Sequence, residues 1–423
     1  TDKLNSKRKT TPATFWKMIK RLRGDAKSSC QALKIGDRLS HDPVERLEVS
    51  RTHLIETFQT PNDPQFDEVH YNDITQHITF NAHRFRPLAH PPPLDPNDPY
   101  TQPVTEDEIE DILRSSTNTA PGPDNIPYIL LKNYPPVALH GLAQIFNASL
   151  QYGYVPSRWK HAHVLMFAKK GRDASNVDNY RPISLTPTIC KTMEGILVRR
   201  LRPLMHTILP DSQVGFRPGY DITDQLLKVQ THLEDMTHNR QLTTIMMALD
   251  IQKAFDTVWI DGLLWKLAAT EIPAPITRWI AHHLNNRTAN TKHHTKLAPT
   301  FTLHAGLPQG SRLSPLLYTV FVADIPQPRE PLVALAQYAD DTCYWSSATC
   351  VRNAKCKLQR TLIPYTQWCN LWRIKINPDK SQIMAIKARR LRHPDAHPIL
   401  LNGHPLRYTR TLKYLGVTFN NRI

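Results

Sequence analysis

The chain has 423 residues, enough for two or three domains or for one large enzyme with several lobes. Its 53 lysine and arginine residues outnumber 37 acidic residues and give a formal net charge of +16, which favours binding to polyanions such as nucleic acids. No apolar run approaches the ~20 residues that span a bilayer, and residues 1–30 lack the apolar core of a secretory signal. We therefore expect no membrane partner and an intracellular location, nuclear and cytoplasmic.

The first hundred residues are polar and interrupted by prolines, so we expect residues 1–104 to form a connecting region. Within it, the segment Phe15–Leu22 is expected to form a short basic amphipathic helix, which either packs against the protein or contacts nucleic acid. A compact fold is expected to begin at Thr105, because Thr105 and Glu108 form a capping box for a helix over Glu106–Arg114.

Beyond Thr105, predicted helices and strands alternate irregularly and without a repeat, which is typical of an α+β enzyme. The chain contains no G-x-G-x-x-G, G-x-x-x-x-G-K, G-x-S-x-G, C-x-x-C or H-E-x-x-H motif, so the usual nucleotide-cofactor, hydrolase, redox and zinc sites are not indicated. Apolar residues at helical spacing predict helices at Val137–Tyr152, Ile189–Met205, Ile222–Leu233, Trp259–Ala268 and Arg352–Trp372. Short β-rich runs predict strands at Val164–Phe167, Leu242–Leu249, Val333–Trp345 and Gln382–Ile386.

Three aspartates lie at the ends of predicted strands. The run Leu242–Leu249 ends directly at Asp250, and two apolar arms flank Asp340 and Asp341, which predicts a hairpin with both acids at its tip. An isolated Asp-Asp pair is more often a solvated turn. Adjacent carboxylates repel each other unless a cation lies between them, however, and phosphoryl transfer at a 3′-hydroxyl uses two divalent ions about 3.5 to 4 Å apart. The three carboxylates are therefore candidate metal ligands.

The sequences around these aspartates resemble the reverse-transcriptase family. Tyr338-Ala339-Asp340-Asp341 resembles the YADD box of that family, and the segment Ala248–Trp259 resembles its first aspartate motif. Further motifs follow in the family's order, and their joint occurrence is far more specific than one box. Ala120–Pro127 and Asn179–Leu185 resemble the fingers motifs of non-LTR retrotransposons, and Gly306–Pro315 resembles the motif that faces template and nucleotide. Asn377–Ser381 resembles the last palm motif, and Leu412–Gly416 resembles the primer grip.

The resemblance covers about Thr105 to Val417, and Phe15–Lys17 with Asp42–Val44 resembles the upstream linker of Jockey-type elements. It implies an α+β right-hand polymerase with fingers and a palm built on an RNA-recognition-like antiparallel sheet plus helices, the thumb being largely missing. The implied division is 1–104 as a linker after an expected endonuclease, 105–240 as fingers and the start of the palm, and 241–423 as palm with the primer-grip hairpin.

The implied activity is RNA-directed DNA polymerisation by a non-LTR retrotransposon, with an RNA template, a DNA primer or target DNA, and dNTPs as partners. The resemblance implies that Asp250, Asp340 and Asp341, with the backbone carbonyl of Ile251, hold two Mg²⁺ ions, for which Mn²⁺ can substitute. Lys380 matches the family's proton donor to pyrophosphate; a surface lysine at a helix end is the alternative.

The resemblance also implies which residues bind the nucleotide and the primer. Phe255 matches the steric gate against a 2′-hydroxyl, although an ordinary core phenylalanine would fit the same position. Gln309 and Gly310 match the pair against the base and sugar, with glycine allowing close backbone approach. Arg181, with Lys169 or Lys170, is expected to clamp the triphosphate. The primer grip is expected to consist of Leu412, Tyr414, Leu415 and Gly416.

Three further features carry expectations of their own. Asn402-Gly403 predicts a hairpin turn that leads into a primer-grip strand over Leu412–Val417. The basic run Lys387–Arg392 either contacts phosphates or is a solvated loop. Arg312 stands where many relatives carry valine, which alters local packing or adds a phosphate contact.

Two other functions compete with reverse transcription. An RNA-dependent RNA polymerase shares the palm and the two-metal chemistry but usually carries Gly-Asp-Asp and lacks an aromatic gate like Phe255. A non-catalytic nucleic-acid-binding remnant of a transposon would retain only electrostatic binding. The intact aspartates favour the enzyme, whereas the missing thumb favours the remnant.

Overall fold

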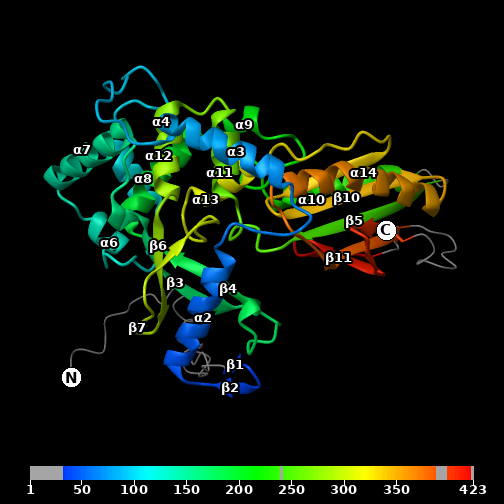
Figure 1. Ribbon diagram of the computed structural model, residues 1–423. Helices are drawn as coiled ribbons and strands as arrows, with labels where there is room; N and C mark the ends of the chain where they lie inside the picture. Colours follow the sequence, from blue (N-terminus) through cyan, green and yellow to red (C-terminus); the bar gives the residue numbers. More distant parts are fainter. Residues whose placement is uncertain (1–31, 239–241, 387–397, 421–423) are drawn as a thin grey trace, which may run out of the picture.

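The structure is a computed structural model that describes residues 32–238, 242–386 and 398–420 (Figure 1). The expected helix over Phe15–Leu22 and the basic run Lys387–Arg392 lie outside these described residues. Within them, no helix combines the length and the apolarity needed to cross a membrane. The fold is α+β, as the sequence predicts, with two five-stranded sheets and helices around them.

The sheet that carries the aspartates, here called the β5 sheet, is mainly antiparallel. Its central strand β5 pairs antiparallel with β10 on one side and β11 on the other, and only the short β14 runs parallel to its neighbour. In spatial order its strands are β14 (Arg407–Tyr408), β11 (Ile376–Ile386), β5 (Thr243–Ile251), β10 (Asp341–Ala348) and β9 (Val333–Tyr338).

Alternating side chains give the β5 sheet two buried faces. Met247 and Tyr344 enter the main core with α11 (Ile260–Ala268), α13 (Ser314–Phe321) and α14 (Val351–Leu371). Met246 and Trp345 enter a second core, formed with α10 (Ile222–His238) and the hairpin of β15 (Thr411–Tyr414) and β16 (Val417–Asn420). Because burying one large apolar side chain stabilises a fold by ~1.5–3 kcal/mol, both faces hold the sheet in place.

The second sheet, here called the β3 sheet, is covered by α2 (Pro43–Thr57). Leu54 and Phe58 at the end of α2 are buried against Val164, Ala289 and Phe301 of the sheet. The helix begins at an N-cap, where the Asp42 side chain accepts hydrogen bonds from the backbone of Val44 and Glu45. The strands are β4 (Tyr180–Leu185), β3 (His161–Ala168), β6 (Arg287–His293) and β7 (Lys296–Leu297) in spatial order, with β8 (Phe301–Leu303) also paired to β6.

The compact fold begins before Thr105, the residue at which the capping box predicted its start. In Figure 1, α3 (Glu68–Phe80) runs beside α11, and Ile74 of α3, Phe85 and Val104 belong to the main core. Apart from Pro43, which begins α2, the prolines from residue 43 to residue 103 lie in connections between elements that are themselves packed. Since few apolar residues mark these helices in the sequence, their packing was not predicted.

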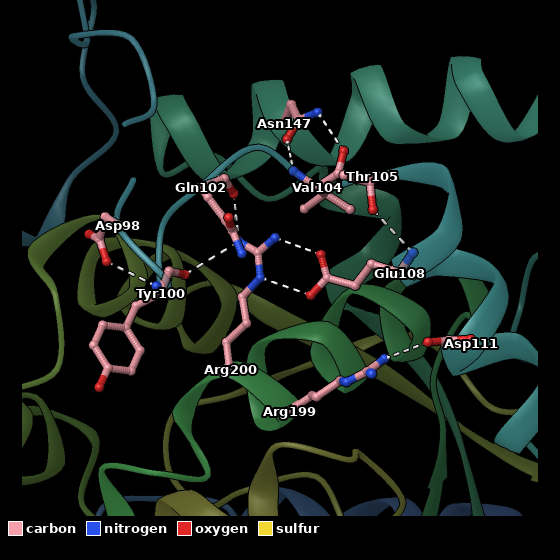
Figure 2. A network of polar contacts seen from close by, with 10 residues as sticks. All are labelled: Asp98, Tyr100, Gln102, Val104, Thr105, Glu108, Asp111, Asn147, Arg199 and Arg200. Carbon is pink, nitrogen blue, oxygen red and sulfur yellow. Dashed lines mark hydrogen bonds and ion pairs between the residues drawn. The ribbon is translucent and has the colours of Figure 1, made fainter. Parts of the chain in front are cut away.

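A buried arginine fastens the end of this region to the rest of the fold (Figure 2). Arg200 of α8 (Thr188–Leu201) donates to the backbone carbonyls of Tyr100 and Gln102 at 3.3 and 2.7 Å, and it pairs with Glu108 at 2.6 Å. Thr105 caps α5 (Glu106–Ser115) by accepting from the Glu108 amide at 3.2 Å. The Glu108 carboxylate, which a capping box would turn back to the helix start, is occupied by Arg200 instead.

The helices and strands predicted beyond Thr105 are present with shifted ends. The run Ile189–Met205 is two helices rather than one, α8 and α9 (Met205–Ile208). The remaining elements of the described residues are α4 (Ala82–Phe85), α6 (Tyr128–Leu131), α7 (Pro136–Tyr152), α12 (Ala274–Leu284), η1 (Ser157–Lys160), η2 (Val177–Asn179), β1 (Leu33–Ile35), β2 (Arg38–Ser40), β12 (Leu400–Leu401) and β13 (His404–Pro405).

Candidate active site

The three aspartates predicted from the sequence come together at one end of the β5 sheet. Asp250 lies near the end of β5, Asp340 lies in the turn between β9 and β10, and Asp341 begins β10. Thr342 pairs with Leu249 in the sheet, which places Asp341 level with Asp250 on the same face. Burial, followed by the negative charges of Asp340 and Asp250, raises the pKa of Asp341 to about 6. This concentration of carboxylates is suited to divalent cations.

A glutamine that the sequence analysis did not identify holds the Asp340 turn. The Gln213 side chain accepts a hydrogen bond from the Ala339 amide at 3.0 Å and donates one to the Ala339 carbonyl at 3.3 Å. Ala339 has a φ of +56°, and a Cβ on Gly215 would lie 2.3 Å from the Ala339 nitrogen. Gly215, two residues after Gln213, was the available sequence signal for such a close backbone approach.

Lys380 projects from a bulge in β11 toward Asp250. Asn377 pairs with Asp250 but Gln382 pairs with Ala248, so the residues between them bulge out of the ladder. The Lys380 Nζ atom lies 3.8 Å from Oδ2 of Asp250, and its charge lowers the pKa of Asp250, although burial raises that pKa more. Lys380 is therefore exposed but lies in a strand bulge rather than at a helix end.

The bulge is fixed by hydrogen bonds to its own backbone and to β5. The Ser381 hydroxyl accepts from the Asp250 amide at 3.1 Å and donates to the Asn377 carbonyl at 2.7 Å. The Asn377 side chain accepts from the Lys380 amide at 3.3 Å. The backbone next to the Asp250 carboxylate is thus held by the Asn377–Ser381 segment. Ile251, whose carbonyl was expected to bind a metal ion, follows Asp250 as the last residue of β5 and pairs with Ile376.

The β3 sheet contributes cations near the carboxylates. Arg181 lies in β4, and its positive charge lowers the pKa of Asp340, which burial raises. Lys169 follows β3, and burial, then Lys380 and Arg181, lowers its pKa. Lys170 is exposed, whereas Lys169 is half-buried, so Lys169 is the lysine of the pair that shares an electrostatic environment with Arg181.

The segments that carry Phe255 and Gln309 are joined by backbone and side-chain contacts. The half-buried Phe255 ring stacks on Tyr318 of α13 with centroids 4.6 Å apart, and the Leu307 amide donates to the Phe255 carbonyl at 2.7 Å. The Gln309 amide group donates to the Asp256 carboxylate at 2.7 Å. Gly310 has a φ of +128°, and a Cβ there would lie 2.5 Å from the Ser184 carbonyl. The glycine is thus required for contact with β4.

The two segments that resemble fingers motifs are packed against each other. A Cβ on Gly122 would lie 2.5 Å from the Pro187 nitrogen, so the first segment runs directly beside the end of the second. The Thr188 hydroxyl donates to the Ile126 carbonyl at 2.6 Å. These contacts place Ala120–Pro127 next to β4, which carries Arg181.

The departure at Arg312 is a packing feature. Its guanidinium donates to the Ser116 hydroxyl at 2.5 Å and lies 5.6 Å from the ring centre of Tyr128. Its backbone amide donates to the buried Glu194 carboxylate at 2.7 Å, and His283 lies 3.3 Å from the other oxygen of Glu194. Glu194, His283 and Cys190 form a buried polar cluster whose donor atoms lie within 4.8 Å of one another, and its Glu194 supports the turn after Gln309.

The predicted primer grip is a hairpin rather than one strand over Leu412–Val417. Leu415 and Gly416, with φ values of +49° and +84°, form the turn between β15 and β16. Leu412 and Tyr414 are buried against the β5 sheet, where the Gln225 side chain donates to the Tyr414 hydroxyl at 3.5 Å. The predicted Asn402-Gly403 turn is present between β12 and β13, with positive φ at both residues.

The chain belongs to the family described as reverse transcriptase (RNA-dependent DNA polymerase), which it matches over residues 167–419. It is 35% identical to the probable RNA-directed DNA polymerase from transposon BS of Drosophila melanogaster, over 76% of this chain and 36% of that protein. It is 33% identical to the RNA-directed DNA polymerase from mobile element jockey of the same organism, over 76% of this chain and 35% of that protein.

The chain therefore spans about a third of the length of these curated relatives, and the resemblance to non-LTR, Jockey-type elements is confirmed. Among solved structures, telomerase from Candida tropicalis in complex with a fragment of telomeric RNA aligns with a TM-score of 0.43 and 12% identity, covering 63% of this chain and 44% of that one.

Proposed function

We propose that the chain copies the RNA of a non-LTR retrotransposon into DNA, as its RNA-directed DNA polymerase. The observation that carries the proposal is the convergence of Asp250, Asp340 and Asp341 at one end of the β5 sheet, with Lys380 and Arg181 beside them. Few sites other than those for nucleotidyl transfer need three carboxylates surrounded by cations, because the substrate is a metal-bound polyphosphate.

The reaction joins the primer 3′-oxygen to the α-phosphorus of a dNTP and breaks the bond from that phosphorus to the pyrophosphate oxygen. Two Mg²⁺ ions, or Mn²⁺ as a substitute, activate the attacking oxygen and stabilise the leaving group when bound. Asp250, Asp340 and Asp341 would hold them, with the carbonyl of Ile251. The fit rests on the clustering of acidic oxygen donors, which is the ligand type that Mg²⁺ prefers.

The remaining groups would bind the nucleotide and move one proton. Arg181 and Lys169 would contact the triphosphate, because guanidinium and ammonium groups bind phosphate oxygens. Lys380 would donate a proton to the leaving pyrophosphate. Phe255 would exclude a 2′-hydroxyl, and Gln309 with Gly310 would lie against the base and sugar.

In the same proposal the nucleic-acid partners are an RNA template and a DNA primer or target DNA. The net charge of +16 favours both, and the hairpin with Leu412, Tyr414, Leu415 and Gly416 would position the primer end. Residues 105–240 would form the fingers and the start of the palm, and 241–423 the rest of the palm. The polymerase would act in the nucleus and cytoplasm.

The decisive assay is oligo(dT)-primed extension on poly(rA) with Mg²⁺ and dTTP. We expect wild-type protein and an Asp73→Asn control, changed on the exposed face of α3, to extend the primer, and Asp340→Ala to fail. Equal extension by Asp340→Ala would rule out the proposed metal site. No extension by any variant, with RNA binding retained, would instead support a binding remnant, and extension with UTP alone would support an RNA polymerase.

A further inference from the structure

Asp256 is a buried carboxylate for which the proposed mechanism has no role. It follows the gate residue Phe255, its side chain is almost fully enclosed, with 4% of the residue exposed, and its Oδ1 atom accepts the hydrogen bond from Nε2 of Gln309 at 2.7 Å. Gln309 is half-buried, so its amide group lies between the enclosed Asp256 and the open side of the site. Asp256 therefore contacts the nucleotide-facing segment without facing the nucleotide itself.

The backbone of that segment is held without Asp256's side chain. The Ser184 amide donates to the Gln309 carbonyl at 2.7 Å, and the Arg312 amide donates to Glu194 at 2.7 Å. Upstream, the Gly306 amide donates to the Val258 carbonyl at 2.8 Å. Because these bonds fix the path of the chain on both sides, the Asp256 contact decides mainly where the Gln309 side chain points.

We propose that Asp256 is a positioning residue that fixes the orientation of the Gln309 amide, turning Nε2 inward and presenting Oε1 to the incoming nucleotide. An ionised carboxylate has acceptors only, so it can bind the NH₂ end of Gln309 but not its carbonyl end. The inference rests on the proposed function, because it gives Gln309 a substrate. Its consequence is that the site offers the nucleotide a hydrogen-bond acceptor at this position.

The surroundings of Asp256 make this orientation sensitive to pH. Burial raises the pKa of Asp256 to about 7, while the Gln309 hydrogen bond and the charges of Lys253 and Lys169 lower it. Below that pH the protonated carboxyl group can donate to Oε1 of Gln309, so the reversed amide becomes equally acceptable. Above it, one orientation remains.

The test compares wild-type protein with Asp256→Asn, which keeps the shape of the side chain but can bind either end of the Gln309 amide. We expect KM for dTTP to rise about twofold in Asp256→Asn, because about half of the Gln309 amides would then point the wrong way, with kcat nearly unchanged. Gln309→Met, which removes Oε1 altogether, should raise KM further, and Asp256→Asn with Gln309→Met should be no worse than Gln309→Met alone. Additive effects in the double variant, or an unchanged KM in Asp256→Asn, would overturn the inference.

A second measurement does not depend on activity. In protein labelled with ¹⁵N-glutamine, the side-chain amide signals of Gln309, assigned by their loss in Gln309→Met, should shift with a midpoint near pH 7 in wild type and stay constant in Asp256→Asn. A Gln309 signal that is insensitive to pH in both proteins would reject the positioning role. If wild-type protein extends no primer, the proposed function fails, while this signal still decides whether Asp256 holds the amide.

Discussion

The ammonium group of Lys380 lies 3.8 Å from the carboxylate of Asp250, which is a candidate metal ligand. Both side chains are partly exposed, so the attraction is screened by water and is weak as a stabilising contact. The contact matters because it shows where Lys380 is positioned. The bulge that carries Lys380 is hydrogen-bonded to the backbone of Asp250, so the ammonium group is held beside that carboxylate.

Replacing Lys380 with methionine should therefore lower kcat by about 10²–10⁴-fold, the usual range for losing a general acid, while leaving primer–template affinity close to wild type. Lys380→Arg should retain the positive charge but donate its proton poorly, and so should lie near Lys380→Met. Lys170→Met, at an exposed lysine, is the matched control. Single-turnover extension measures these rates, and a kcat within twofold of wild type for Lys380→Met would exclude the proton-donor role.

Divalent-ion binding should weaken as the pH falls through about 6. The pKa of Asp341 is raised to about 6 by burial and then by Asp340 and Asp250, so below this pH a proton competes with the cation. The ionised form is unfavourable without a cation, so the metal-free protein should lose stability as the pH rises from about 4, where an ordinary aspartate ionises, to about 6. Mg²⁺ should raise the unfolding temperature more at pH 7.5 than at pH 5.5. In Asp341→Asn this difference should largely disappear, and an equal Mg²⁺ effect at both pH values in wild type would contradict the prediction.

Sugar discrimination should depend on Phe255. Phe255→Val removes the ring that stacks on Tyr318, and the ratio of kcat/KM for dTTP to that for UTP should fall by about ten- to a hundredfold. Tyr318→Phe retains the stacking ring and is the control that should leave the ratio unchanged. Unaltered discrimination in Phe255→Val would make Phe255 an ordinary packing residue.

The Asp340 turn should depend on Gln213. Gln213→Leu removes both hydrogen bonds to Ala339 from a fully buried position, and it should lower the free energy of unfolding by about 2 kcal/mol and reduce primer extension. Gln213→Glu keeps the acceptor for the Ala339 amide but puts a buried carboxylate against the Ala339 carbonyl, so it should be at least as destabilising as Gln213→Leu. Urea unfolding measures the free energy of unfolding of each variant. Equal stability of wild type and both variants would show that the Asp340 turn does not depend on Gln213.

The parts of the fold that sequence could predict are those carried by local patterns. The apolar runs before Asp250 and around Asp340 predict strands, and the structure contains β5, β9 and β10 there, because an apolar run bounded by turn residues has few other solutions. Asn402-Gly403 predicted its turn for the same reason. The position of Lys380 was harder to predict, because the bulge that carries it depends on the register of β11 with β5 and not on the residues within the bulge.

Other residues of the site could not be found from local patterns because their partners are distant in sequence. Gln213 contacts a residue 126 positions away, and Glu194 one 118 positions away. Asp256 looks like any polar residue after a strand until Gln309 is seen beside it. The packing of α2 and α3 was not predicted because proline-rich connections dominate the composition of the region. The few residues that reach the core are far apart in the sequence and form no clear pattern.

The contact of α2 with the rest of the fold shows that the family match and the folded unit begin at different residues. The carbonyl of Phe58 accepts from the amides of both His304 and Ala305, and the Thr57 hydroxyl accepts from Lys253 at 2.9 Å. A protein trimmed to the family match at 167–419 would lose these partners just ahead of Gly306 and would expose the core around Ala289 and Phe301 to water. The stretch that matches the family, 167–419, is thus shorter than the stretch that packs together, and an expression fragment needs to begin upstream of Pro43.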